Sequence, residues 1–313
     1  MIPKNWIPPE RVTDLLNRVI QEPPAYISQN ILTRGGTLLL GGEAKTGKSF
    51  LMLELARALT TGKSFLNNSA FSVPMRAKVI YIEAENGEVT TQKRIREIFK
   101  DEDPRVYGDY FFHRSKNLDY QLDARSGIEY FVQDIQAVRP NVIILDPISF
   151  MFHKDENDAT EVGKLYLTLA RLKELGADEN TSIVMAHHFK KPPTGDAAEG
   201  YDFLSEYNFR GSSKWKDGGD SLITMHRGRT YRHPDNSEWW SLKMRFLTRH
   251  GSSPPEGWYA FNQKDDLRIR AMEGKESLAG GRVALPKLKL VRPVVQQDIN
   301  WGLGAIAAEG KGE

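Results

Sequence analysis

The octapeptide GEAKTGKS at residues 42–49 constrains the fold of this chain of 313 residues more than any other segment. It fits the pattern G-x-x-x-x-G-K-[ST] in full. The apolar run at residues 37–41 in front of it predicts a buried strand, and the run FLMLELARAL at residues 50–59 behind it predicts a helix. A strand, a glycine-rich loop and a helix in this order are typical of an α/β fold.

The middle of the chain repeats this alternation. Further strands are predicted for the apolar runs at residues 78–82, 141–145 and 182–186. Helices are predicted where apolar residues recur every three or four positions, at Ile128, Phe131, Ile135 and Val138, ending before Pro140, and again at residues 162–172. We therefore expect a mainly parallel twisted sheet with flanking helices.

After residue 219 the pattern changes to consecutive strands. We predict them at residues 220–225, 238–247 and 257–262, with the last two paired as a hairpin across the GSSPP sequence at 251–255. They add antiparallel strands at the C-terminal side of the sheet. We divide the chain into a lead segment, residues 1–35, a core, residues 36–262, and a partly ordered tail, residues 263–313.

Composition excludes several classes of protein. The chain has no cysteine, which excludes disulfides and thiolate zinc sites. It has neither an apolar run of about 18 residues nor a secretory signal pattern, so we expect no membrane span and a cytoplasmic location. With 43 basic and 41 acidic side chains the net charge is +2, and any nucleic-acid site must therefore be local.

The octapeptide predicts a phosphate site, because its glycines let backbone N–H groups wrap an anion at the positive end of the following helix. Lys48 would reach the β and γ phosphates, and Ser49 would offer a hydroxyl to Mg²⁺. ATP and Mg²⁺ are the expected ligands. The sequence contains no Asn-Lys-x-Asp quartet, so guanine specificity is not indicated. The alternative is a chance glycine-rich turn. The residues assigned to the site are Gly42, Glu43, Ala44, Lys45, Thr46, Gly47, Lys48, Ser49 and Phe50.

Acidic residues follow two of the predicted strands. Asp146 ends the most apolar strand, where an acid holds the Mg²⁺ shell in such sites; the alternative is an Asp that only caps the Asp-Pro turn. The next residue, Pro147, cannot activate water. Glu83 and Glu85, two apart and sharing a face of an extended strand, are the candidates for the base. We favour Glu85, just beyond the strand end, over the alternative of two solvated carboxylates.

Two further features follow the strand at residues 182–186. His187 and His188 stand at its tip, where a polar side chain can sense a γ-phosphate, although histidines satisfied by the backbone fit equally well. Arg210 lies in a loop, followed by glycine and two serines. Such an arginine can extend to a phosphate on a neighbouring subunit, whereas an isolated Arg-Gly pair usually marks a turn.

Taken in order, GGEAKTGKS, YIEAEN, IILDPISF, MAHHFKK and RGSSKWKDGGDS resemble the RecA-like P-loop ATPase core, and within it the RepA-type hexameric helicase family. The resemblance covers roughly residues 30–230 and implies a RecA-like fold. It implies that Glu85 is the catalytic glutamate, Asp146 the Walker B acid and His188 the sensor. It also implies that Arg210 is an arginine finger acting on ATP held by the adjacent subunit of a ring.

The same resemblance implies two loops, residues 150–161 and 189–207, that face a central channel and contact single-stranded DNA. The second loop carries Lys190 and Lys191 beside four acids, Asp196, Glu199, Asp202 and Glu206. Its aromatic residues, available either for base stacking or for packing the loop down, are Phe189, Tyr201, Phe203 and Tyr207. Six copies of these loops in one channel would concentrate positive charge that a nearly neutral subunit lacks.

The expected function is therefore an ATP-driven hexameric helicase or translocase on single-stranded DNA in plasmid, phage or mobile-element replication, with a primase or replication initiator as a possible partner. A RecA-like recombination or repair ATPase is one alternative, disfavoured because only about 35 residues precede the first strand. A regulatory ATPase resembling KaiC, acting without DNA, is the other.

Overall fold

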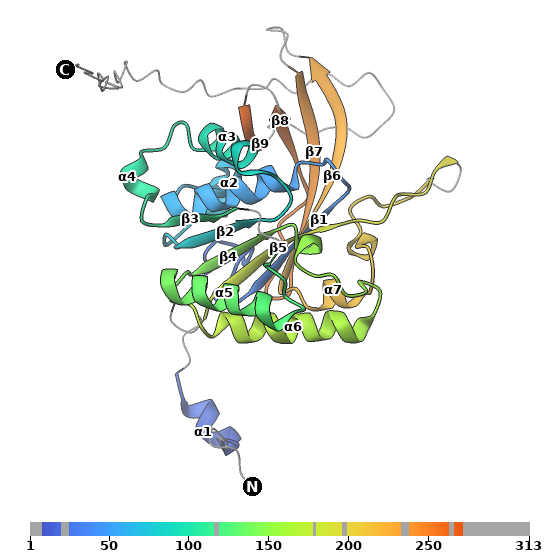
Figure 1. The fold of residues 1–313 in the computed structure, drawn as a ribbon. Coiled ribbons are helices and arrows are strands. Elements are labelled where there is room, and N and C mark those ends of the chain that lie inside the picture. The colour runs from blue at the N-terminus through green and yellow to red at the C-terminus, as the bar shows by residue number, and fades with distance from the viewer. Residues whose placement is uncertain are drawn as a thin grey trace, which may run out of the picture. The chain divides into compact units, whose positions relative to one another are not determined.

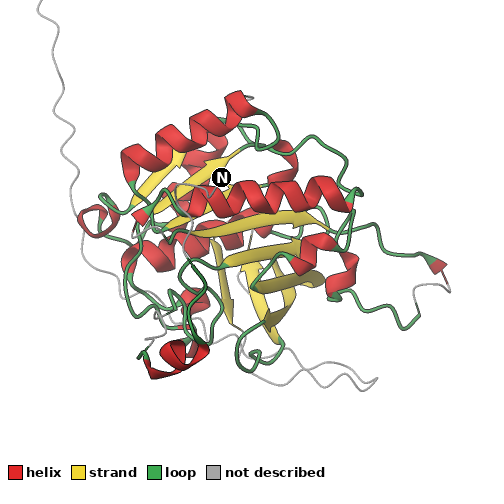
Figure 2. Cartoon of the chain, turned by 90° about the horizontal axis from the view of Figure 1, so that it is seen from below, coloured by secondary structure: helices red, strands yellow, loops and turns green. Residues whose placement is uncertain are grey.

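The computed structural model describes residues 8–19, 25–115, 119–177, 180–195, 199–232, 238–262 and 266–271. These residues form a nine-stranded sheet in the order β3-β2-β4-β5-β1-β6-β7-β8-β9. Helices cover both faces of its parallel part (Figures 1 and 2). No helix among these residues is long and apolar enough to cross a membrane.

The parallel part of the sheet confirms the predicted strands. They are β1 (Thr37–Gly42), β2 (Val79–Glu83), β4 (Val142–Asp146) and β5 (Ser182–His188). Strands β1, β2 and β4 are buried along their whole length, as expected of strands covered on both faces. A strand that we did not predict, β3 (Phe111–Arg114), pairs with β2 at the edge of the sheet.

Helices α2 (Lys48–Thr61) and α3 (Glu88–Ile98) pack on one face, and α5 (Arg125–Val138) and α6 (Ala159–Lys173) on the other (Figure 1). Helix α5 ends before Pro140, as predicted, with Arg139 in the left-handed conformation. In α6 the residues at the predicted spacing, Val162, Leu165, Leu169 and Leu172, are buried. The shorter helices are α1 (Val12–Asn17), α4 (Pro104–Tyr107), α7 (Lys214–Asp217) and the 3-10 turns η1 (Phe65–Asn67), η2 (Ser69–Phe71), η3 (Ile148–Phe150) and η6 (Glu206–Asn208).

The last four strands are β6 (Ser221–Arg232), β7 (Glu238–Thr248), β8 (Gly257–Asn262) and β9 (Asp266–Ala271). Strand β6 runs parallel to β1, and the rest are antiparallel to their neighbours, including the predicted β7–β8 hairpin. The sheet continues past residue 262, where we placed the end of the core, because β9 pairs with β8. The rest of the predicted tail, residues 272–313, lies outside the described residues. Tyr26, Ile27, Ile31 and Leu32, from the predicted lead segment, are buried in the core.

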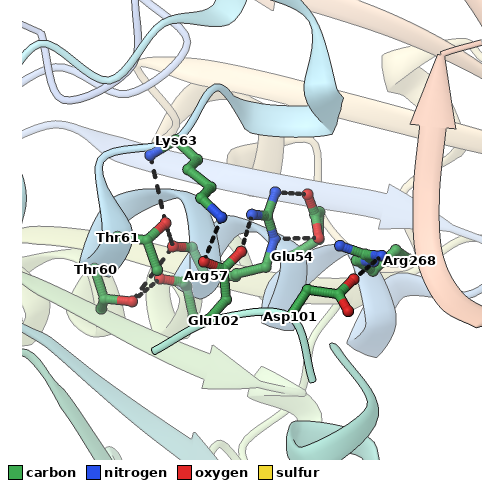
Figure 3. A network of polar contacts seen from close by, with 9 residues as sticks. Glu54, Arg57, Thr60, Thr61, Lys63, Asp101, Glu102 and Arg268 are labelled. Atoms are coloured by element: carbon green, nitrogen blue, oxygen red, sulfur yellow. Dashed lines mark hydrogen bonds and ion pairs between the residues drawn. The ribbon is translucent and has the colours of Figure 1, made fainter. Parts of the chain in front are cut away.

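An ion network joins α2 to the chain after α3 (Figure 3). The guanidinium of Arg57 donates to Glu54 through Nε at 2.9 Å and Nη2 at 2.5 Å, and to Glu102 through Nη1 at 2.8 Å. Lys63 Nζ lies 2.7 Å from the second oxygen of Glu102. Two cations and two carboxylates thus neutralise each other, three of them buried and Lys63 at the surface, and the network ties down the helix that follows the glycine-rich loop.

Candidate nucleotide site

Four of the predicted site residues are the last residues of neighbouring strands: Gly42 of β1, Glu83 of β2, Asp146 of β4 and His188 of β5. The register aligns Gly42 with His188 and Glu83 with Asp146. The carboxyl ends of parallel strands are where ligands bind in open α/β sheets. The fold therefore brings these residues to one edge of the sheet.

The glycine-rich loop leads straight into α2. Gly47 has φ +96°, a conformation that favours glycine, and Lys48 begins the helix. Lys48 Nζ donates to the carbonyl oxygens of Gly42 at 2.8 Å and Glu43 at 2.7 Å. Burial lowers the pKa of Lys48 to about 8, although the charges of Asp146, Glu85 and Glu43 oppose this shift. An anion at the helix start would stabilise the charged form of this lysine.

Phe50, the last residue assigned to the site, has its side chain in the core. Its ring centroid lies 4.8 Å from that of Phe261 on β8, and the Arg94 guanidinium sits 5.0 Å from the Phe50 centroid. A ligand at the loop would meet the backbone of this residue rather than its buried ring.

Asp146 and Ser49 offer oxygen atoms to a cation. Ser49 hydrogen-bonds the buried carboxylate of Asp146, and the phenol of Tyr81 donates to Asp146 Oδ2 at 2.5 Å. Burial and the neighbouring charge of Glu83 raise the pKa of Asp146 to about 6. Among the described residues no three His, Cys, Asp or Glu side chains form a metal cage. This donor set fits Mg²⁺, which binds through one or two carboxylates together with substrate phosphates and water.

The two glutamates after β2 lie in different surroundings. The strand ends at Glu83, whose buried carboxylate accepts hydrogen bonds from the backbone N–H groups of Glu85 at 2.9 Å and Asn86 at 2.8 Å. The expectation that both glutamates share a strand face is therefore wrong, because the chain turns at Glu83. Glu85 is exposed, and its charge acts on Lys48.

The two histidines also differ. His187 is fully buried, its ring centroid 4.1 Å from that of Trp215, and its Nδ1 accepts from the backbone N–H of His188 at 2.9 Å. His188 is half-buried and feels the charge of Lys48. Burial lowers the pKa of each to about 4, so both imidazoles are neutral at pH 7. Of the two histidines, only His188 feels the charge of Lys48, the lysine predicted to bind phosphate.

Arg210 is attached to the tip of β5 through its backbone. Its N–H donates to the carbonyl of His188 at 3.0 Å, next to a bridge between Phe189 and Phe209. Its guanidinium reaches the first of the two predicted DNA loops, where Nε and Nη2 donate to the carboxylate of Glu156 at 2.7 and 2.8 Å. The side chain of Arg210 is 54% exposed.

The aromatic residues of the second predicted loop differ in burial and in the residues they contact. Phe189 is buried against Phe209, so of the two possibilities left open for it, packing the loop down holds and base stacking does not. The ring of Tyr201 contacts that of Phe203, which packs on His226, whereas Tyr207 is exposed beneath the ammonium of Lys216. Asp202 forms an ion pair with Arg245. Among the other charged residues of this loop, Asp196 lies outside the described residues, and the structure describes Lys190, Lys191, Glu199 and Glu206.

Sequence reasoning missed two residues at this edge. Tyr81 lies two positions before Glu83, and the period of a strand puts both on one face, so the signal for Tyr81 was present. Glu156 pairs with Arg210 across 54 positions of the chain. A single sequence carries no signal for such a pair.

Comparisons with known proteins agree with this geometry. A family model, AAA_25, described as an AAA domain, matches residues 7–194, more than half of the chain. The DNA repair protein RadA of Listeria monocytogenes is 25% identical over 158 residues, which is 50% of this chain. The match spans 28% of the length of that relative. The family match includes the glycine-rich loop, Glu85, Asp146 and His188, and it ends before Arg210.

Proposed function

This chain belongs to the AAA_25 family of RecA-like P-loop ATPases, and on that premise we propose that it is a ring-forming ATPase that moves along single-stranded DNA. The protein would act as a helicase or translocase in plasmid, phage or mobile-element replication, with a primase or initiator as its partner. The observation that carries this proposal is the position of Arg210, whose backbone is linked to the tip of β5 and whose side chain is 54% exposed.

A half-exposed arginine next to the proposed sensor strand suits catalysis in trans. Because the backbone of Arg210 is bonded to His188, a change at the γ-phosphate would pass directly to the arginine. Arginine fingers stabilise the charge that develops on the transferred phosphoryl group and contribute about 10³ to 10⁵ in rate. A finger that serves the neighbouring subunit's ATP requires a closed assembly, and we propose a hexamer.

The other residues would divide the chemistry of hydrolysis among them. Lys48 would hold the β and γ phosphates, and Ser49 and Asp146 would hold Mg²⁺. The bound Mg²⁺ would neutralise phosphate charge. Glu85 would take the proton of the attacking water, since it is exposed beside Lys48 while Glu83 is occupied by backbone N–H groups. His188, neutral at pH 7, would donate or accept a hydrogen bond at the γ-phosphate.

Single-stranded DNA would contact the two loops after β4 and β5. The described parts of these loops expose Phe150, Lys154, Lys190, Lys191 and Tyr207. Exposed cations and exposed rings suit a strand whose phosphates and bases are both accessible. Asp202 does not weaken this surface, because Arg245 on β7 neutralises it at 2.7 Å.

A subunit-mixing experiment tests the ring and the finger together. Lys48→Ala subunits bind ATP poorly but carry a normal Arg210, and Arg210→Ala subunits bind ATP but lack the finger. Each alone should lose turnover by at least about 10³-fold, and an equal mixture should regain a measurable fraction. Full activity of Arg210→Ala alone would show that Arg210 is not an arginine finger. Strand displacement on forked DNA, with the mixture beside each pure variant, then tests the helicase step.

A DNA-repair ATPase is the second candidate, and the similarity to a DNA repair protein RadA favours it. Particle shape on single-stranded DNA separates the two, since closed rings support the translocase and continuous filaments support a recombinase-like role. An ATPase rate that single-stranded DNA does not change, together with no binding at low salt, would favour a regulatory ATPase over both.

A further inference from the structure

The segment Arg210–Gly211–Ser212 contacts one residue, Glu156, through all three of its members. The Arg210 guanidinium binds the Glu156 carboxylate. The backbone N–H of Ser212 donates to the Glu156 carbonyl at 2.7 Å, and Trp215 Nε1 donates to the same oxygen at 3.3 Å. The Arg-Gly-Ser segment that the sequence analysis singled out therefore holds Glu156 in place.

Gly211 permits this close approach. Its φ is +91°, and a Cβ built there would lie 2.2 Å from the Glu156 carbonyl oxygen. No L side chain fits that space without moving the backbone. With the loop in this position, the main-chain contacts hold Glu156 so that its side chain lies opposite Arg210 whatever the charge of that side chain.

The carboxylate of Glu156 is held as an anion. Its side chain is only 15% exposed, which by itself would favour the protonated form, but the hydrogen bonds and the positive charge of Arg210 outweigh this and lower its pKa. The pair is nevertheless open to solvent on one side. It lies in the wall of an open cleft of about 430 Å³, formed with residues 152–157.

We propose that Glu156 is the resting counter-ion of Arg210, occupying the guanidinium until the loop at residues 150–161 moves, and so restraining hydrolysis in the absence of DNA. The inference rests on the proposed function. A guanidinium that binds one carboxylate through Nε and Nη2 cannot present the same two donors to a phosphate, and the two anions compete for it. Glu156 belongs to the loop proposed to contact DNA, so binding there would withdraw it from Arg210.

Glu156 is thus a positioning residue that acts through Arg210. Glu156→Gln tests it cleanly, because glutamine keeps the size and the backbone contacts to Ser212 and Trp215 and removes only the charge. We expect ATP turnover without DNA to rise about two- to fivefold, the factor that corresponds to losing an exposed ion pair. The stimulation by single-stranded DNA should fall by the same factor, and the melting temperature should fall by no more than about 4 °C.

Two further variants show whether the effect runs through Arg210. In an Arg210→Ala background, Glu156→Gln should give no increase, since there is no arginine to release. Glu97→Gln removes a glutamate on α3 from another surface ion pair, with Lys100 just beyond that helix, and should leave turnover unchanged. An increase that persists without Arg210, or that Glu97→Gln reproduces, would show a general charge effect and overturn the inference.

A basal rate of Glu156→Gln equal to or below that of the wild type would also overturn it, as would a raised rate with unchanged DNA stimulation. Failure of the proposed function has a different pattern. Arg210→Ala then keeps wild-type turnover, or DNA does not stimulate the wild type. If Arg210→Ala is inactive and Glu156→Gln has the turnover of the wild type, the counter-ion role of Glu156 is overturned and the finger assignment stands.

Discussion

Arg57 and Arg210 make the same contact in opposite surroundings. Each uses Nε and Nη2 to hold both oxygens of one glutamate, Glu54 in the first case and Glu156 in the second. The side chain of Arg57 is 1% exposed and that of Arg210 is 54% exposed. Arg57 also binds Glu102, whose second oxygen binds Lys63, so this network is closed by four charged groups (Figure 3).

The difference in burial decides what each pair can do. Breaking the Arg57 pair strands charges where water cannot reach them, which is costly, so the contact is permanent. Although burial opposes it, the adjacent Glu54 and Glu102 raise the pKa of Arg57. Water can solvate Arg210 when its pair breaks, so that pair contributes little stability and can exchange its anion. The same geometry is thus a fixed support for α2, the helix after the glycine-rich loop, where it is buried, and an exchangeable contact at Arg210, where it is exposed.

Arg57→Met is the largest test of this difference. It leaves Glu54 without a cation in the core, and we expect the free energy of unfolding to fall by about 3–5 kcal/mol in urea denaturation. Arg57→Met with Glu54→Met removes both partners and should recover most of the loss, because a buried pair replaced by apolar groups is often neutral. A loss below about 1 kcal/mol for the single variant would mean that the network is not a support.

Gly211→Ala breaks the exposed pair at its backbone. Both the φ of +91° and the clash with the Glu156 carbonyl act against alanine, and we expect a loss of about 1–3 kcal/mol in unfolding free energy. Gly200→Ala is the matched control, since Gly200 has φ +73° and nothing within 4 Å of a built Cβ. The control should lose only the conformational part, about 1 kcal/mol. Equal losses for the two variants would show that the close approach to Glu156 carries no energy.

Arg210→Ala should have the smallest effect on stability, although the proposed function expects it to have a large effect on turnover. We expect a loss under about 1 kcal/mol at pH 7, because the arginine is more than half exposed. The sign of its pH dependence follows from Glu156, whose pKa is lowered from 4.5. That contribution is present above pH 4.5 and is lost as the pH falls, so wild type and variant should converge in acid. A difference that grows on acidification would contradict the ion pair as its source.

Local patterns were enough to predict the central strands and the helices α2, α5 and α6, because burial on one or both faces leaves a period in the sequence. They were also enough to place Asp146 and His188 at strand ends. Strand β3 was missed because only its first half is partly buried, which leaves the four-residue strand no period to detect. Helix α3 was missed because it buries only Thr91 and Ile98.

The partners of the two arginines were beyond prediction for a different reason. Glu102 and Glu156 lie 45 and 54 positions from Arg57 and Arg210, and no local period reports on such pairs. The burial of Phe189 depends likewise on Phe209, which only the return of the chain after residue 199 brings near. The roles given to Glu85, His188 and Arg210 in hydrolysis stay predictions that the variants above address.

The sheet order has a consequence for dividing this chain. The family match ends at residue 194, between β5 and β6, yet β6 pairs with β1 along Leu38–Gly42. A fragment cut there would leave the strand that feeds the glycine-rich loop as a bare edge, and it would uncover the α2 surface that β7, β8 and β9 shelter. Exposed edges invite pairing with other chains, so such a fragment should aggregate. The residues that the family model matches therefore lack four strands, β6 to β9, that belong to the same sheet.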